Sequence, residues 1–235
     1  GVVLGWGRTF GLLHRQALVT ATLPYAFADI SGNVYEQQQS VTRSGLADFR
    51  ARVALNLYGS PAQTPQEFAG RRRPPLLVGT SLTVTAPTGQ YFGDKLINIG
   101  TNRWAFKPEV GVSVPWKTFD FDVYAGAWLF TDNADFFPGG QSRHQDAVST
   151  VQGHVSYTLR PSLWLAADGT WYGGGASSVG GGPKSGRLDN TRLGGTLSLP
   201  LTASQSAKFA YSRGALVRAG SDFSTIIVAW QLRWF

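Results

Sequence analysis

The sequence predicts an all-β protein, a transmembrane antiparallel β-barrel, from three observations. Apolar and polar residues alternate with a period of two along nearly the whole chain, whereas helical spacing is nearly absent. Several of these runs extend to about ten residues, longer than the roughly five or six of soluble strands and close to the roughly 9–11 that a tilted membrane strand needs. Short and long connections also alternate along the chain, as they do in outer-membrane barrels.

The composition favours a membrane barrel over a soluble β-protein. Charged residues make up 15% of the 235 residues, below the roughly 25% of soluble domains, while aromatic residues reach 13%. No stretch approaches the ~18 consecutive apolar residues of a spanning helix. The absence of cysteine excludes disulfides and thiolate metal sites. The net charge of +7 comes from scattered basic residues, apart from the run Arg71–Arg73, so no nucleic-acid partner is expected.

Eleven predicted strands follow from the alternating runs. The clearest run is 118–130, in which Phe119, Phe121 and Val123 share one face and Asp120 and Asp122 the other. In a membrane barrel the apolar face contacts lipid and the polar face lines the lumen. The same separation of apolar from polar positions recurs in the runs 46–58, 103–115, 147–160, 162–172 and 190–201. In chain order the predicted strands cover residues 2–10, 16–28, 46–58, 76–87, 103–115, 118–130, 147–160, 162–172, 190–201, 206–217 and 222–235, within one domain that spans 1–235.

The connections between these strands predict the orientation of the barrel. Outer-membrane barrels have short periplasmic turns and long extracellular loops. Short turns are expected at residues 13–16, 115–118, 160–162 and 202–204, and long loops at 30–44, 89–101, 131–145 and 173–187. The link 58–75, which contains Arg71–Arg73, is long but falls on the periplasmic side, so we expect a solvated loop, a small plug or a contact site there.

The start of the chain predicts that one strand is missing. The chain begins at Gly1 and contains no methionine, so we expect an N-terminally incomplete barrel. If the C-terminus is periplasmic and the eleven strands alternate in direction, the first strand runs toward the periplasm. Because bacterial barrels usually have an even number of strands, we expect one more upward strand before Gly1 and about twelve strands in the complete barrel.

The alternation also selects residues that face the lumen. Mixed charges there can pair across strands and satisfy one another, or form a polar constriction that selects solutes, and the sequence leaves both interpretations open. Asp48 and Arg103 are expected in the same lumen. The candidate residues that line the lumen and determine selectivity are Arg50, Arg52, Lys107, Glu109, Asp120, Asp122, Asp168, Arg192 and Lys208.

No catalytic residue, metal site or cofactor is expected, and the chain is not predicted to be an enzyme. His14, His144 and His154 are far apart and lack the spacing of metal ligands. An enzymatic alternative would require His154, Ser156 and Asp168 within hydrogen-bond reach. Polar residues that fill the lumen explain these three side chains more simply.

The end of the chain resembles the C-terminal signal that the barrel-assembly machinery recognises. That signal alternates apolar residues and ends in an aromatic, usually Phe. Trp230, Leu232 and Trp234 keep the alternation, and Phe235 lies one residue beyond the expected register. We therefore predict that Trp230, Leu232 and Trp234 face lipid, while Gln231 and Arg233 face the lumen.

Longer stretches resemble a known family of outer-membrane channels, named for the MetA pathway of phenol degradation. The resemblance covers residues 46–235 and implies an outer-membrane barrel that passes small aromatic or other hydrophobic compounds. It carries over no catalytic residues. The resembling stretches are "RVALNLYGSPAQTPQEFA", "SLTVTAPTGQY", "LINIGTNRWAFKPEVGVS", "YAGAWLFTDNADFF" and "SRGALVRAGSDFSTIIVAWQLRWF".

Together these features predict a porin-like transport channel in the outer membrane of a Gram-negative bacterium. Its expected function is passive uptake or diffusion of small, aromatic or hydrophobic solutes. The alternative is a closed structural barrel that anchors or contacts another envelope protein complex. The expected partners are the lipid bilayer and lipopolysaccharide, the barrel-assembly machinery during biogenesis and, in the alternative, another envelope protein.

Overall fold

The computed structural model describes residues 1–34, 37–63, 76–220 and 222–234, and its regular elements are all β-strands. In the described part of the chain, no helix has the length and apolar character required to cross a membrane. The strands are β1 Val2–Leu12, β2 Arg15–Val34, β3 Gln37–Leu46, β4 Arg50–Tyr58, β5 Leu77–Thr85, β6 Ala105–Trp116, β7 Phe119–Phe130, β8 Asn133–Phe136, β9 Gln141–Gln145, β10 Val148–Arg160, β11 Leu163–Gly174, β12 Ser177–Val179, β13 Leu188–Pro200, β14 Gln205–Val217 and β15 Ser224–Leu232.

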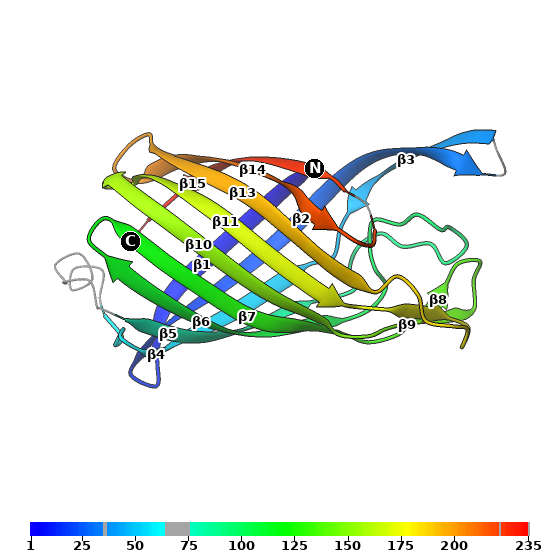
Figure 1. Ribbon diagram of the computed structural model, residues 1–235, viewed down its shortest axis with the longest axis horizontal. Helices are drawn as coiled ribbons and strands as arrows, with labels where there is room; N and C mark the ends of the chain where they lie inside the picture. Colours follow the sequence, from blue (N-terminus) through cyan, green and yellow to red (C-terminus); the bar gives the residue numbers. More distant parts are fainter. Residues whose placement is uncertain (35–36, 64–75, 221, 235) are drawn as a thin grey trace.

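Eleven of these strands follow one another in an antiparallel path, which confirms the predicted barrel fold. The path runs β1-β2-β4-β5-β6-β7-β10-β11-β13-β14-β15. β3 lies off this path and pairs with the C-terminal half of β2. Figure 1 shows the strands tilted and wound around the long axis, with the turns that join β6 to β7, β10 to β11 and β13 to β14 at one end. The further strand expected before Gly1 stays a prediction.

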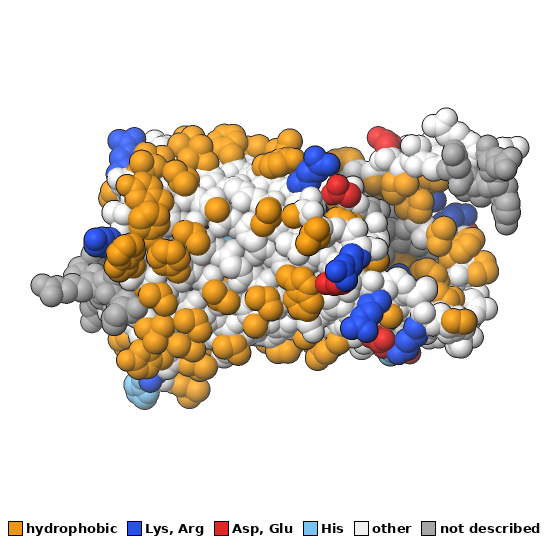
Figure 2. All heavy atoms as spheres, in the orientation of Figure 1, with side chains coloured by type: hydrophobic (Ala, Val, Ile, Leu, Met, Phe, Trp, Pro, Cys, Tyr) orange, Lys and Arg blue, Asp and Glu red, His pale blue; other side chains and the backbone are white. Residues whose placement is uncertain are grey.

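The exposure of side chains along β6 shows why these residues form a membrane strand. Val110, Val112 and Val114 point outward, and Val110 is 52% exposed. Lys107, on the opposite face, is 8% exposed, and Glu109 is also turned inward. Because successive strand residues point to opposite faces, one strand supplies both an apolar exterior and a polar interior. Figure 2 shows the resulting apolar exterior, with the charged side chains gathered near the two ends.

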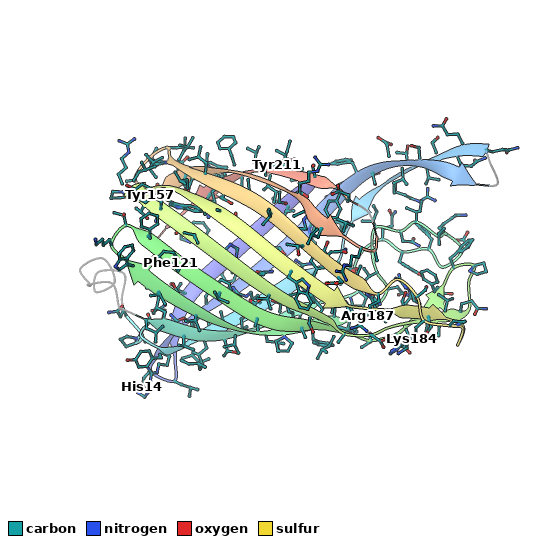
Figure 3. The ribbon with its side chains drawn as sticks, in the orientation of Figure 1. His14, Phe121, Tyr157, Lys184, Arg187 and Tyr211 are labelled. Atoms are coloured by element: carbon teal, nitrogen blue, oxygen red, sulfur yellow. The ribbon has the colours of Figure 1, made fainter. Side chains whose placement is uncertain are left out.

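Aromatic residues concentrate near the end of the barrel that carries the short turns. Trp116 and Phe119 flank one such turn with ring centroids 6.3 Å apart, and Phe119 lies 4.9 Å from Tyr157 on the adjacent strand. Phe121 extends the group along β7. Phe121 and Tyr157 lie at this end in Figure 3. Such rings are typical of the aromatic girdle at a membrane interface.

The predicted short turns are confirmed, and their backbone is unusual for the residues they contain. Leu12 pairs with Arg15, so Leu13 and His14 form a two-residue hairpin turn. Both have positive φ, 51° and 59°, which is the conformation of a type I′ turn and favours Asn and Gly. Lys117 and Ser162, in two further short turns, also have positive φ.

The predicted loop 30–44 is mostly a hairpin instead, and the prediction was wrong there. β2 continues to Val34 and pairs with β3, with Ile30 opposite Val41. The Thr42 hydroxyl donates to Asp29 at 2.8 Å on the same hairpin. The segment has no continuous apolar face, so its sequence resembles a loop although its backbone pairs as a sheet. Two other predicted loops, 131–145 and 173–187, contribute a small sheet in the order β12-β9-β8.

The long link predicted at 58–75 is only partly described, because residues 64–75, with Arg71–Arg73, lie outside the described residues. Its start packs against the β1–β2 turn. The Gln16 amide donates to the Ser60 carbonyl at 3.3 Å, and the Ala62 amide donates to the His14 carbonyl at 3.1 Å. The link therefore begins as a short antiparallel contact beside the hairpin.

The last strand has the predicted orientation, although Phe235 lies outside the described residues. Trp230, Leu232 and Trp234 are exposed on the outer face. Gln231 lies 3.5 Å from the Ser206 hydroxyl, and the Arg233 guanidinium donates to Ser162 at 3.2 Å. The assembly role of these aromatic residues stays a prediction.

Replacing Leu13 and His14 by Asn and Gly is expected to stabilise the barrel by about 1 kcal/mol. An L-residue other than Asn or Gly costs roughly 1–2 kcal/mol in the left-handed region, partly offset by the entropy of glycine in the unfolded chain. Urea unfolding in lipid vesicles, followed by tryptophan fluorescence, measures the change. His14→Ala is the control, because it keeps a Cβ atom and the cost. An equal gain in the control would contradict the proposed cause.

Val110→Arg is expected to destabilise the barrel by about 2–4 kcal/mol, because it places a charge on the lipid face near the centre of β6. Ser113→Arg is the matched control, since the same side chain then points into the lumen opposite Asp122. The urea midpoint in vesicles and the heat-dependent gel shift of the folded barrel measure both variants. Equal loss in the two variants would contradict the assignment of the faces.

Candidate functional site in the lumen

A cavity of about 360 Å³ lies against the inner face of the barrel wall formed by β1, β2 and β4 to β7. Its lining combines charged, polar and apolar side chains. Arg52, Glu109 and Asp122 provide the charges, while Leu18 and Tyr124 provide apolar and aromatic surface. The alternation of the strands places all of these residues on the inward face, so the cavity belongs to the lumen.

The strongest charge cluster in this wall joins Arg52, Lys107 and Glu109. The Arg52 guanidinium lies 3.5 Å from one carboxylate oxygen of Glu109, and the Lys107 ammonium contacts the other. Lys107 also lies 5.9 Å from the centre of the Trp128 ring, and Arg50 lies 5.5 Å from the same ring. Arg52 and Lys107 thus share one carboxylate, and Arg50 and Lys107 share one aromatic ring.

The register of the sheet explains why these side chains meet. Arg52 of β4 and Lys107 of β6 each lie opposite Thr83 of β5. Thr83 is small and buried. The longer side chains of Arg52 and Lys107 can therefore extend past it from both sides. Glu109, one inward step further along β6, lies opposite Ser81 and contacts both cations. A row of short side chains on β5 therefore leaves the space that this charge cluster occupies.

A second cluster lies further around the wall at His154 and Asp168. The His154 Nδ1 lies 2.5 Å from one Asp168 oxygen, and the Thr196 hydroxyl donates to the other at 3.1 Å. The His154 and Tyr124 rings meet in an edge-to-face arrangement with centroids 5.7 Å apart, and Asp122 lies directly opposite His154 in the strand register. The histidine is thus placed between two strands that each present a carboxylate.

The arrangement that an enzyme would need is only partly formed. His154 and Asp168 are hydrogen-bonded, but in the described part of the chain no hydrogen bond joins Ser156 to His154. The same strand face carries Ser156 two residues beyond His154, toward the short turns. Within the described residues, no group of three or more His, Cys, Asp or Glu side chains could hold a metal ion.

Arg192 and Lys208 lie on the other part of the wall, each against an aromatic ring. The Arg192 guanidinium lies 4.0 Å from the centre of Phe223 and donates to the Ser212 hydroxyl at 3.1 Å. The Lys208 ammonium lies 5.2 Å from the centre of Trp164. Neither forms an ion pair among the described residues, so each faces the lumen as a cation on an aromatic surface.

The predicted lumen residues therefore form separate groups rather than one ring. Arg50, Arg52, Lys107 and Glu109 lie together, Asp122 and Asp168 flank His154, and Arg192 and Lys208 stand apart. Asp120 lies near the end with the short turns, opposite Pro115 and Ser156. The list of lumen candidates from the sequence left out the aromatic members of this wall, which are Tyr124, Trp128 and Trp164. Their positions on the polar face of the alternation are the signal that could have identified them.

Asp48 and Arg103 precede β4 and β6, so the predicted strands 46–58 and 103–115 began too early, and the prediction that both side chains face the lumen stays a prediction. Both belong to the loop end of the barrel. The Asp48 carboxylate accepts hydrogen bonds from the Gly89 amide, the Thr101 amide and the Thr101 hydroxyl at 2.9, 2.9 and 2.6 Å. Arg103 precedes β6 by two residues and donates to Gln145 at 2.5 Å. The alternation alone does not mark where a strand begins and the preceding loop ends.

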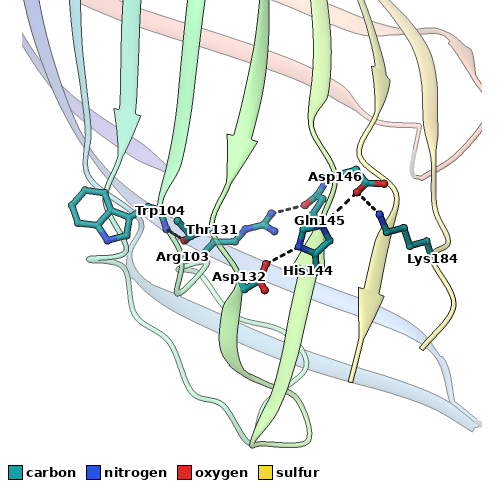
Figure 4. Close-up of polar contacts among 8 residues, drawn as sticks. All are labelled: Arg103, Trp104, Thr131, Asp132, His144, Gln145, Asp146 and Lys184. Atoms are coloured by element: carbon teal, nitrogen blue, oxygen red, sulfur yellow. Dashed lines mark hydrogen bonds and ion pairs between the residues drawn. The ribbon is translucent and has the colours of Figure 1, made fainter. Parts of the chain in front are cut away.

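Beside Arg103, the loop end carries a chain of charged contacts. His144 lies between Asp132 at 2.8 Å and Asp146 at 3.4 Å, and Lys184 donates to Asp146 at 2.5 Å. Figure 4 shows these contacts linking β9 to the neighbouring loops. The hydrogen bond from Lys184 lowers the pKa of Asp146 below its ordinary value. Asp132, His144, Asp146 and Lys184 thus pair with one another, whereas Arg103 contacts Gln145.

Comparison with known proteins agrees with the fold. A model of the family described as "Putative MetA-pathway of phenol degradation" matches residues 4–224. None of the curated proteins matches the chain. One similar solved structure is that of the COG4313 outer membrane channel from Pseudomonas putida F1, with a TM-score of 0.78 and 20% identity. The alignment covers 97% of this chain and 80% of that chain. At this level of identity the likeness concerns the fold.

Glu109→Gln is expected to destabilise the barrel by about 3 kcal/mol, because it leaves the largely buried Lys107 ammonium without its carboxylate. Adding Lys107→Met to the same chain is expected to recover most of the loss, since it removes the unpaired charge. Urea unfolding of the wild type, both single variants and the double variant gives the coupling energy. Additive effects of the two substitutions would show that the pair is not coupled.

Proposed function

This chain belongs to the family described as "Putative MetA-pathway of phenol degradation", and we propose that it mediates passive uptake of small aromatic or hydrophobic solutes. It is a β-barrel of the bacterial outer membrane. The observation that carries the proposal is the cavity of about 360 Å³ on the inner face of the barrel. The fold of the similar solved structure, an outer membrane channel, supports a channel of this general type.

The two sides of the lumen differ in a way that suits such solutes. One side presents Arg52, Lys107 and Glu109, together with the face of Trp128. The other side is formed by the inward positions of β1 and β15, which carry no charge: Val3, Gly5, Gly7, Thr9, Gly11, Thr225, Ile227, Ala229 and Gln231. A solute with an apolar ring and one polar group can satisfy both sides at once.

A closed barrel that contacts another envelope protein is the second candidate. Its support is the material that extends beyond the barrel at the loop end, namely the β2–β3 hairpin and the small sheet β12-β9-β8 (Figure 1). The mutual pairing of Arg52, Lys107 and Glu109 is compatible with this function too. Conduction separates the two candidates, because a closed barrel passes neither ions nor solutes.

The purified protein in planar bilayers is expected to conduct ions, and proteoliposomes are expected to swell faster in a phenyl glucoside than in sucrose. The aromatic solute can use the ring faces and the uncharged side of the lumen, whereas the sugar cannot. Vesicles without protein and vesicles with an unrelated closed barrel are the controls. Absence of both conductance and solute flux would exclude the channel and favour the closed barrel.

Glu109→Gln is also expected to shift ion selectivity toward anions, because Arg52 and Lys107 then face the lumen without their carboxylate. The reversal potential across a salt gradient measures this shift. Asp189→Asn is the matched control, since this carboxylate pairs with Arg218 at 2.8 Å at the loop end rather than within the lumen cluster. Equal shifts in the two variants would show that selectivity follows overall charge and not the lumen wall.

A further inference from the structure

A second cavity, of about 170 Å³, lies among the loops at the mouth and is separate from the lumen cavity. Its walls come from three parts of the chain. The loop before β6 contributes Tyr91, Leu96 and Arg103, β8 contributes Phe136, and β9 contributes Arg143. This volume is below the roughly 300–1,000 Å³ of sites for drug-sized ligands, so it suits a molecule with one ring.

The walls of this mouth cavity are held in place before any ligand binds. The Asn133 amide donates to the Tyr91 hydroxyl at 2.8 Å, and its carbonyl oxygen accepts from Asn102 at 2.9 Å. The Tyr91 hydroxyl in turn donates to the Asp135 carbonyl at 2.8 Å. The side chain of Asn98 fixes its own loop through three hydrogen bonds, with Phe92 and Lys95. The bonds of Asn133 and Tyr91 join the loop before β6 to β8, and those of Asn98 hold that loop itself, so the cavity has a defined shape.

The charge of the cavity is carried by Arg103 and Arg143. Arg103 stacks over Phe130, with 4.3 Å from Cζ to the ring centre, and its Nη2 donates to Gln145. Its Nη1 is buried and has no hydrogen-bond partner. Burial and the nearby Arg143 lower the pKa of Arg103 to about 10, although Asp132 and Asp48 act in the opposite direction. Arg103 therefore stays charged at neutral pH with one buried N–H group unsatisfied, which is costly.

The carboxylates near Arg103 and Arg143 already interact with other groups. Asp132 contacts His144, Asp48 accepts three hydrogen bonds from Gly89 and Thr101, and Asp135 accepts from the Gly140 amide at 3.0 Å. Among the described residues, none of them forms an ion pair with Arg103 or Arg143. The two arginines that line the cavity therefore carry positive charge that no described carboxylate pairs.

The remaining surface of the cavity is apolar and aromatic. Arg143 lies 5.2 Å from the centre of the Phe136 ring, so one face of that ring is already part of a cation–aromatic arrangement. Leu96 and the ring of Tyr91 complete this side. A planar ring fits against such a surface, and a carboxylate on that ring would reach the guanidinium groups, which bind carboxylates through paired N–H donors.

We propose that this cavity is a binding site for a small aromatic carboxylate, of which benzoate is the simplest, at the extracellular mouth of the barrel. The site lies outside the lumen and its occupancy does not depend on conduction. It goes beyond the proposed uptake function, because binding is measurable whether or not the barrel passes solutes.

Isothermal titration of the full chain in detergent with benzoate tests the proposal. Benzoate is expected to bind, whereas benzyl alcohol, which has the ring but no charge, and acetate, which has the charge but no ring, are each expected to bind at least about tenfold more weakly. Equal binding of benzoate and benzyl alcohol, or of benzoate and acetate, would overturn the proposal. Absence of benzoate binding to the folded barrel would overturn it as well.

Variants separate this site from general attraction to a basic protein. Arg143→Gln and Arg103→Gln are each expected to weaken benzoate binding by about tenfold or more. Arg218→Gln is the matched control, because Arg218 is an exposed arginine at the same end that pairs with Asp189. Equal weakening in the control would attribute binding to overall charge and overturn the site. Phe136→Ala, which leaves both arginines in place, is expected to weaken benzoate but not acetate, and keeps the test valid if Arg103→Gln does not fold.

Discussion

The rest of this structure depends on one constraint, the pairing of backbone N–H and C=O groups between neighbouring strands in a medium without water. Within a bilayer an unpaired backbone group costs several kcal/mol, so each strand must match its neighbour residue by residue. Register then decides on which face every side chain lies. The opposition of Thr83 to both Arg52 and Lys107, and of His154 to both Asp122 and Asp168, follows from that pairing. The lumen chemistry is thus a consequence of backbone geometry.

The same constraint explains how much of the fold was accessible from the sequence. A period of two is imposed wherever one face meets lipid and the other the lumen, so the eleven strands and the short turns could be predicted from the positions of residues such as Val110 and Asp122. Beyond the membrane both faces meet water and the period disappears. That is why the β2–β3 hairpin looked like a loop, and why the predicted strands that contain Asp48 and Arg103 began too early.

The candidate site was predictable only as a list of inward residues. Periodicity shows on which face of a strand each residue lies. The contact of Glu109 with Arg52 and Lys107 also depends on the register between strands and on the small side chains of β5. Neither can be read from the sequence of one strand. The aromatic rings were left out of the list of lumen candidates for another reason. Trp128 and Trp164 interact with cations in this lumen, whereas tryptophan in a barrel usually signals the lipid interface. The position of Trp128 and Trp164 on the polar face indicated the lumen, whereas their residue type suggested the lipid interface.

The β2–β3 hairpin has a consequence for how the molecule meets its surroundings at the cell surface. Its strands are held together chiefly by main-chain pairing, with side chains such as Gln38, Gln39 and Ser40 exposed. Backbone pairing tolerates exchange of exposed side chains, because their identity contributes little to the fold. The hairpin can therefore accept substitutions at its exposed positions while the barrel wall below it keeps its register. For the same reason it is a natural place to graft an epitope or a label that reports on the protein in intact cells.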